Sequence, residues 1–125
     1  MQDAQILNVQ ALVRRYIEAF NETEADRRRE LLEALYTADC TYTDPHVDLQ
    51  GADQIDGFIA QTQERFPGLT FTLGGPIDAH HDQARFQWHA GPADAPDAYV
   101  GFDVIVTDDG RIRNVYGFMD ATPAA

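Results

Sequence analysis

Four side chains in this 125-residue sequence could exchange or share a proton, and they come from four separate segments. Asp44 stands in "YTDP", Asp103 interrupts the apolar run "VGFDVIV", Tyr16 ends "RRY", and His89 ends "FQWH". Carboxyl, phenol and imidazole groups serve in general acid–base catalysis and in stabilising a developing negative charge. We therefore expect a catalytic role for these four residues if the fold brings them together.

The two aspartates also have purely structural interpretations. A residue before proline favours extended geometry, so Asp44 can simply end a strand and cap the backbone N–H groups of a turn. Alternatively, its carboxylate points into a pocket. Asp103 would be costly in an apolar strand unless it is protonated, hydrogen-bonded, or paired with Arg85 or Arg113.

The other polar candidates have structural interpretations too. Tyr16 can pack in the core with its hydroxyl bonded, and His89 can be a half-buried histidine with satisfied ring nitrogens. The histidines at 46, 80, 81 and 89 show no zinc-ligand spacing, so the sequence predicts no metal site.

Charge and composition exclude several classes of function. The chain has 21 acidic and 9 basic residues, a net charge of -12, which argues against nucleic acid and anionic membranes as partners. All nine basic residues are arginine, and the sequence contains neither lysine nor serine. A lysine Schiff base, a P-loop lysine and a serine nucleophile are therefore excluded, and we expect chemistry that needs no cofactor.

The length suits one domain, residues 1–125, with a real hydrophobic core. No apolar run approaches the length that spans a bilayer. The first residues, "MQDAQILNVQALVRRY", lack a basic leader and an uninterrupted apolar segment, so we expect a cytoplasmic protein. Cys40, the single cysteine, is expected to be a small buried hydrophobic residue.

Hydrophobic periodicity predicts three helices followed by a β-meander. The helices cover residues 9–20, 25–36, and 52 or 53 to 66, and the strands cover 69–73, 84–90, 98–107 and 111–119. The first helix places Tyr16 on its apolar face, the second exposes its arginines at 27–29, and the third buries Phe58. An Asp-Gly pair between the last two strands predicts a hairpin turn. The fold class is α+β.

The two faces of the predicted sheet differ in character. One carries only apolar side chains, and the other, which we expect to line a pocket, mixes aromatic with polar ones. The residues placed on the mixed face are Gln87, His89, Tyr99, Gly101, Asp103, Ile105, Asn114, Tyr116 and Phe118. We expect a small hydrophobic ligand to contact Phe58, Gln87, Trp88, Tyr99, Asn114, Tyr116 and Phe118. Helices must cover one side of the sheet, so the other can pair with a second subunit.

The order of elements and the segments "RRYIEAFN", "YTDP", "GFDVIVTDDGRI" and "VYGFMD" resemble the nuclear transport factor 2-like superfamily over nearly the whole chain. This superfamily includes ketosteroid isomerases and SnoaL-like polyketide cyclases. The resemblance implies a cone-shaped, curved antiparallel sheet wrapped around three N-terminal helices, with an internal pocket and commonly a dimer.

Individual residues match the steroid isomerases of this superfamily. Tyr16 and Asp103 match the two residues of the isomerase oxyanion hole, and Asp44 matches the general base. Gln87 and His89 depart from that pattern and resemble polyketide cyclases instead. A third relative, the limonene epoxide hydrolase type, has Arg-x-Asp on this strand, and Gly101 in the arginine position argues against it.

Two functions of different class remain open. The first is a cofactor-free enzyme, an isomerase, cyclase or dehydratase, that moves a proton next to a carbonyl of a small hydrophobic substrate. Asp44 or Asp103 would then be the base, with Tyr16 and His89 stabilising the enolate oxygen. The second is a non-catalytic small-molecule-binding or dimerisation module of the same fold.

Overall fold

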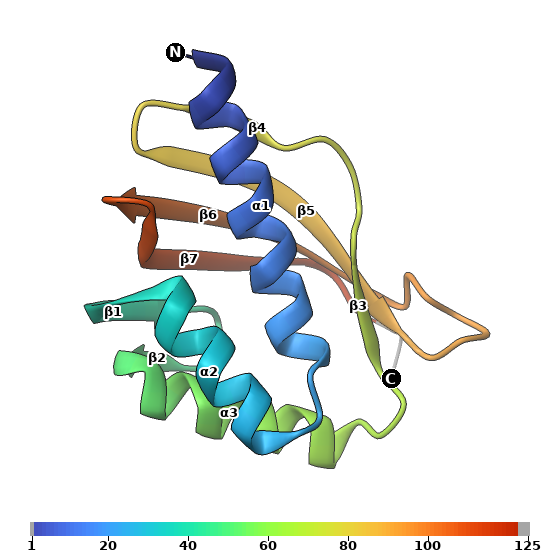
Figure 1. Cartoon of the computed structure of the whole chain (residues 1–125). Coiled ribbons are helices and arrows are strands. Elements are labelled where there is room, and N and C mark those ends of the chain that lie inside the picture. The colour runs from blue at the N-terminus through green and yellow to red at the C-terminus, as the bar shows by residue number, and fades with distance from the viewer. Residues whose placement is uncertain (1, 123–125) are drawn as a thin grey trace.

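A computed structural model describes residues 2–122 of the chain (Figure 1). Its elements, in chain order, are α1 (Gln2–Asn21), α2 (Ala25–Leu35), β1 (Tyr36–Thr43), β2 (Asp48–Gln50), α3 (Gly51–Arg65), β3 (Thr70–Leu73), β4 (Asp78–His80), β5 (Gln83–Gly91), β6 (Tyr99–Asp108) and β7 (Arg111–Ala121). The predicted helices and the final hairpin are confirmed. In this part of the chain, no helix combines the length and the apolarity needed to cross a membrane.

The strands form one curved sheet with the order β2-β1-β7-β6-β5-β3, and β4 pairs with the remaining length of β5. Figure 1 shows the helices gathered on one side of this sheet, with α1 running across the middle strands. The predicted α+β class and cone are confirmed, but the sheet is mixed because β1 runs parallel to β7. The sequence pattern predicted only antiparallel pairs of strands. It gave no sign that β1, which follows α2 and precedes α3 in the chain, would pair with the last strand, β7.

The β6–β7 hairpin fixes the register of the central strands. Asp108 pairs with Arg111, so only Asp109 and Gly110 form the turn. Both turn residues have positive φ angles, 51° and 79°, as a type I′ turn requires. The turn sets the first two pairs, and a shift of one residue between Val106 and Thr107 then gives the register in which Asp103 pairs with Gly117.

The core lies between α1 and the face of the sheet that the helices cover, called here the inner face. Helix α1 buries Val9, Leu12, Val13, Tyr16 and Phe20 at the expected spacing. The sheet contributes Phe86, Ile105, Ile112 and Val115, all almost fully buried. Cys40 is buried as predicted. Full burial of such side chains stabilises a fold by roughly 1.5–3 kcal/mol each.

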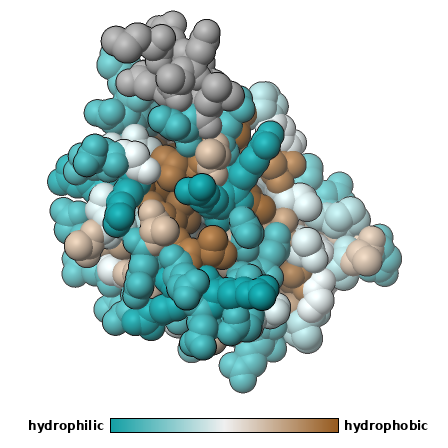
Figure 2. Space-filling model, in the orientation of Figure 1, coloured by the Kyte–Doolittle hydropathy of each residue, from teal (hydrophilic) through white to brown (hydrophobic). Residues whose placement is uncertain are grey.

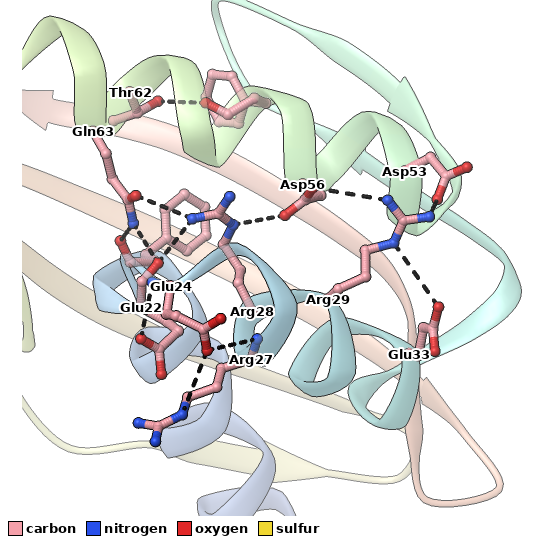
Figure 3. A network of polar contacts seen from close by, with 12 residues as sticks. Glu22, Glu24, Arg27, Arg28, Arg29, Glu33, Asp53, Asp56, Thr62 and Gln63 are labelled. Atoms are coloured by element: carbon pink, nitrogen blue, oxygen red, sulfur yellow. Dashed lines mark hydrogen bonds and ion pairs between the residues drawn. The ribbon is translucent and has the colours of Figure 1, made fainter.

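Arg28 corrects one expectation, because it is buried and not part of a solvated arginine face. Its guanidinium donates hydrogen bonds to Asp56 Oδ1 at 2.6 Å, to Gln63 Oε1 at 3.1 Å and to the Glu22 carbonyl at 2.9 Å (Figure 3). A buried arginine needs such partners to offset its lost hydration. The network ties α2 to the end of α1 and to one side of α3.

Candidate active site

A cavity of about 300 Å³ lies between the helices and the inner face of the sheet. Most of its lining is aromatic or aliphatic, including Phe20, Tyr42, Phe58, Phe71 and Trp88. Figure 2 shows hydrophobic residues gathered at the centre of the helix-covered side of the molecule, with hydrophilic residues around them. The volume is at the lower end of the range for small-molecule sites.

A hydrogen bond between Tyr16 and Asp103 lies at the buried end of this cavity. The Tyr16 hydroxyl donates to Asp103 Oδ2 at 2.7 Å, and both residues are only 2% exposed. Edge contacts with Phe20 and Phe86, at centroid distances of 5.3 and 5.6 Å, hold the phenol ring in place. The partner of Asp103 is thus a tyrosine, and neither of the arginines that the sequence offered as alternatives.

Burial perturbs the ionisation of both members of the pair. The pKa of Asp103 is raised from 3.8 to about 6, mainly by loss of hydration. Hydrogen bonds from Tyr16 and the Trp88 indole lower this pKa, and the charge of Asp44 makes a smaller contribution that raises it. Burial, followed by the charge of Asp103, raises the pKa of Tyr16 well above its ordinary value. Tyr16 is therefore a neutral donor at physiological pH, and Asp103 can exchange a proton close to it.

Gly101 makes room for the indole beside Asp103. A Cβ atom at this position would lie 2.0 Å from Cζ2 of Trp88, so the indole lies across the glycine backbone. Trp88 and Gly101 are paired neighbours on β5 and β6. An arginine at position 101, as in the epoxide hydrolase pattern, would need the space that the indole fills.

Asp44 satisfies both interpretations that the sequence left open. Strand β1 ends at Thr43, and Asp44 Oδ1 accepts hydrogen bonds from the backbone N–H groups of His46 at 2.8 Å and Val47 at 3.2 Å, as in a turn. The same side chain lines the cavity, where Oδ2 accepts a hydrogen bond from the Tyr42 hydroxyl at 2.9 Å. Turn formation therefore fixes the carboxylate at the cavity wall.

The side chains of Asp44 and Asp103 meet at Gly117 on β7. A Cβ atom on this glycine would lie 2.9 Å from Asp103 Oδ1 and 3.2 Å from Asp44 Cβ. Both aspartates thus pack against one backbone position that has no side chain. Their proximity explains why the charge of Asp44 raises the pKa of Asp103.

Five of the predicted site residues do not line this cavity. They are Gln87, His89, Asn114, Tyr116 and Phe118. The register pairs Phe86 with Asp103 and Gln87 with Phe102, so the inner face takes even-numbered residues of β5 and odd-numbered residues of β6. The sequence analysis had placed the odd-numbered residues of β5 on the same face as the odd-numbered residues of β6. An error of one residue in the pairing of two strands moves every side chain of one strand to the other face of the sheet.

The displaced polar side chains have structural contacts on the outer face. The His89 ring packs against Gly74, where a Cβ atom would lie 2.7 Å from the ring. The Asn114 amide donates a hydrogen bond to the Thr41 hydroxyl at 2.8 Å. Within residues 2–122, no three histidine, cysteine or acidic side chains are grouped as metal ligands would be.

The remaining predicted residues line the cavity: Tyr16, Asp44, Phe58, Trp88, Tyr99 and Asp103. Sequence reasoning missed Tyr42, which bonds to Asp44, and the exposed residues His46, Gln61 and Arg65. The signal for Tyr42 was present, because it lies two residues before Asp44, which follows directly on the end of β1, and residues two apart in extended chain point to the same side.

We predict that Asp103 makes the stability of the protein depend on pH. The folded pKa is about 6 and the ordinary value is 3.8, so between these values the folded state binds more protons than the unfolded state. The contribution of Asp103 to the free energy of unfolding therefore falls as pH rises through this window, by about 3 kcal/mol in total, and levels off above it.

Urea unfolding of the wild type and the Asp103→Asn variant, from about pH 4 to about pH 8, measures this effect. The stability of the wild type relative to the variant should decline by about 2.4 kcal/mol across this range, because the rest of the total is lost below pH 4. A difference that is the same at both ends would contradict a raised pKa at Asp103.

Comparisons with known proteins agree with this fold. A model of the SnoaL-like domain matches residues 13–115. A crystal structure of a candidate isomerase of the SnoaL-like family from Agrobacterium tumefaciens is 33% identical, with a TM-score of 0.87, and the match covers 92% of this chain and 99% of that one. Among curated proteins, none matches the chain.

Two less similar structures share the fold. A candidate ketosteroid isomerase from Kribbella flavida is 21% identical, with a TM-score of 0.70 over 94% of this chain and 82% of that one. A candidate SnoaL-like polyketide cyclase from Jannaschia is 17% identical, with a TM-score of 0.71 over 90% and 85%. The predicted resemblance is therefore confirmed at the level of fold and family, and this chain belongs to the SnoaL-like family.

Proposed function

We propose that this protein is a cofactor-free acid–base enzyme that moves a proton at the carbon next to a carbonyl group of a small hydrophobic substrate, as an isomerase, cyclase or dehydratase. The supporting observation is that Asp44, Asp103 and Tyr16 meet on one predominantly apolar cavity. Many acid–base enzymes have two carboxyl groups in one site that excludes water, with surroundings that give the two groups different pKa values.

In this proposal Asp44 is the base. Its carboxylate removes the proton from the α-carbon, and the C–H electron pair moves onto the carbonyl oxygen to give an enolate. The Tyr42 hydroxyl and two backbone N–H groups hold the carboxylate in one orientation, which reduces the entropy lost in reaching the transition state. Asp44 then returns the proton to the substrate, and the carbon that receives it depends on which of the three reactions takes place.

Tyr16 and Asp103 stabilise the enolate oxygen, for which the Tyr16 hydroxyl turns its one proton from Asp103 Oδ2 toward the substrate. Tyr16 keeps its proton because burial raises its pKa. Asp103, with a pKa of about 6, adds a second donor when it is protonated. Donors already fixed in an apolar cavity stabilise a developing oxyanion more strongly than water does.

Deuterium exchange tests this function without the natural substrate being known. Butyrophenone, a small aryl ketone, is incubated with the protein in D₂O, and loss of the α-proton signal is followed by NMR. The wild type should accelerate exchange, and Asp44→Asn should reduce the enzymatic rate by about 10²–10⁴-fold because it removes the base. Asp48→Asn, at an exposed carboxylate nearby, serves as the control and should retain the full rate.

A tyrosine pair provides a second control for the same experiment. Tyr16→Phe should lower the exchange rate by about 10²-fold or more, whereas Tyr36→Phe removes an equally buried hydroxyl that does not line the cavity. Exchange no faster than in buffer, with butyrophenone still bound, would contradict the enzyme and favour a non-catalytic binding module.

We also propose that the protein forms a homodimer through the outer face of the sheet. The middle of this face consists of Gln87, His89, Val100, Phe102, Val104, Val106, Asn114, Tyr116 and Phe118, and Arg85, which the register pairs with Val104, lies on the same face. Phe118 is 57% exposed and Tyr116 is 43% exposed. Arg85 is paired with Asp78, and the middle of the face carries no aspartate, glutamate or arginine, although the chain has a net charge of -12. A second copy can therefore approach the middle of this face without direct repulsion between charges.

Sedimentation velocity checks the dimer. The wild type should sediment as a dimer, and Phe118→Asp should weaken association at least about tenfold by placing two carboxylates in the interface. Ala11→Asp, at an exposed position on α1, is the control and should not change association. A wild type that is monomeric at all concentrations, or a Phe118→Asp variant that dimerises normally, would contradict this interface.

A further inference from the structure

The cavity has a buried end and an exposed end with opposite electrostatic character. Asp103 and Tyr16 lie at the buried end, and Asp44 is half-buried close to them. The exposed lining residues, called here the rim, are His46, Gln61, Arg65, Phe66 and Thr122. A ligand that fills the cavity therefore has one end near two carboxyl groups and the other end near the rim.

Arg65 is the only arginine in the cavity lining. It is the last residue of α3, and it forms no ion pair with any of the side chains described, those of residues 8–122. Three arginines of α2 and Arg85 on β5 each pair with an acidic side chain. Among the described side chains, the arginines at 14, 15, 111 and 113 form no ion pair either, but they lie outside the cavity. With 21 acidic residues in the chain, an arginine at the rim without an acidic partner leaves its guanidinium available to an anion from outside.

The two ends together would select both the ligand and its orientation. A carboxylate at the buried end would be repelled by Asp44 and Asp103 and would lose its hydration without compensation. At the rim the same carboxylate could form a bidentate pair with the guanidinium while it stays partly hydrated. The neutral ketone of such a molecule would then lie at the Tyr16–Asp103 pair.

We propose that the substrate is an amphipathic keto acid, with an apolar body and a ketone that enter the cavity and a carboxylate that Arg65 binds at the rim. This inference rests on the proposed function for the position of the ketone. The competing explanation is that Arg65 is solvated and only complements the carbonyl groups at the C-terminal end of α3. Only the first explanation makes Arg65 favour a ligand with a carboxylate over the same ligand without one.

Trp88 provides a direct measurement of binding. It is the single tryptophan of the chain and lines the cavity, so quenching of its fluorescence reports occupancy without any turnover. The two probes are benzoylbutyrate, an aryl ketone with a carboxylate tail, and its uncharged methyl ester. We expect the wild type to bind the acid about three- to tenfold more tightly than the ester at low ionic strength, with the preference shrinking as salt is added.

The Arg65→Gln variant should lose this preference and bind the two probes within a factor of about two of each other, and Arg65→Lys should retain part of it. Arg15→Gln is the matched control, because Arg15 is an exposed arginine on α1 outside the cavity. Equal binding of acid and ester by the wild type, an unchanged preference in Arg65→Gln, or failure of both probes to bind would each overturn the inference. Because binding alone is measured, these outcomes are separate from the deuterium exchange that tests the proposed function.

Discussion

The hydrogen bond from Tyr16 to Asp103 is the interaction on which both the fold and the proposed chemistry depend. It joins α1 to β6 across 87 positions of sequence, inside the apolar core. A carboxyl group buried there without a partner would cost several kcal/mol. Helix α1 and the central strands can therefore pack closely only if the tyrosine lies opposite the aspartate.

The same packing gives the pair its proposed reactivity. Burial that stabilises the core also raises the pKa of Asp103 to about 6 and keeps Tyr16 protonated. Two glycines make this possible, since Gly101 leaves space for the Trp88 indole, and Gly117 leaves space for the Asp103 carboxyl group and the Cβ atom of Asp44. Glycine weakens a strand, so its presence in two central strands is explained by close approach of neighbouring groups.

The sequence predicted those features that depend on nearby residues. The three helices follow from apolar spacing, and the hairpin follows from Asp-Gly flanked by apolar runs. Asp103 attracted notice because a carboxylate interrupts an apolar strand, and Tyr16 because it falls on the apolar side of its helix. Asp44 needed the family resemblance as well, since its turn alone did not indicate a cavity.

Features set by long-range pairing were not predictable in the same way. The alternation along one strand shows which of its residues share a face of the sheet. It does not show which residues of the next strand lie on that same face, so Gln87 and His89 were assigned to the inner face although they lie on the outer one. The parallel contact of β1 with β7 and the buried Arg28 likewise depend on segments far apart in the sequence.

The central claim is that Asp103 titrates near neutral pH because it is buried beside Tyr16. Carbon NMR of the aspartate side-chain carboxyl groups, recorded from about pH 3 to about pH 8, measures this directly, with Asp103→Asn identifying the signal. The structure predicts one carboxyl group with a pKa of about 6 that disappears in the variant. If the Asp103 signal instead titrates near the ordinary aspartate value, the buried pair lacks the proton chemistry proposed for it.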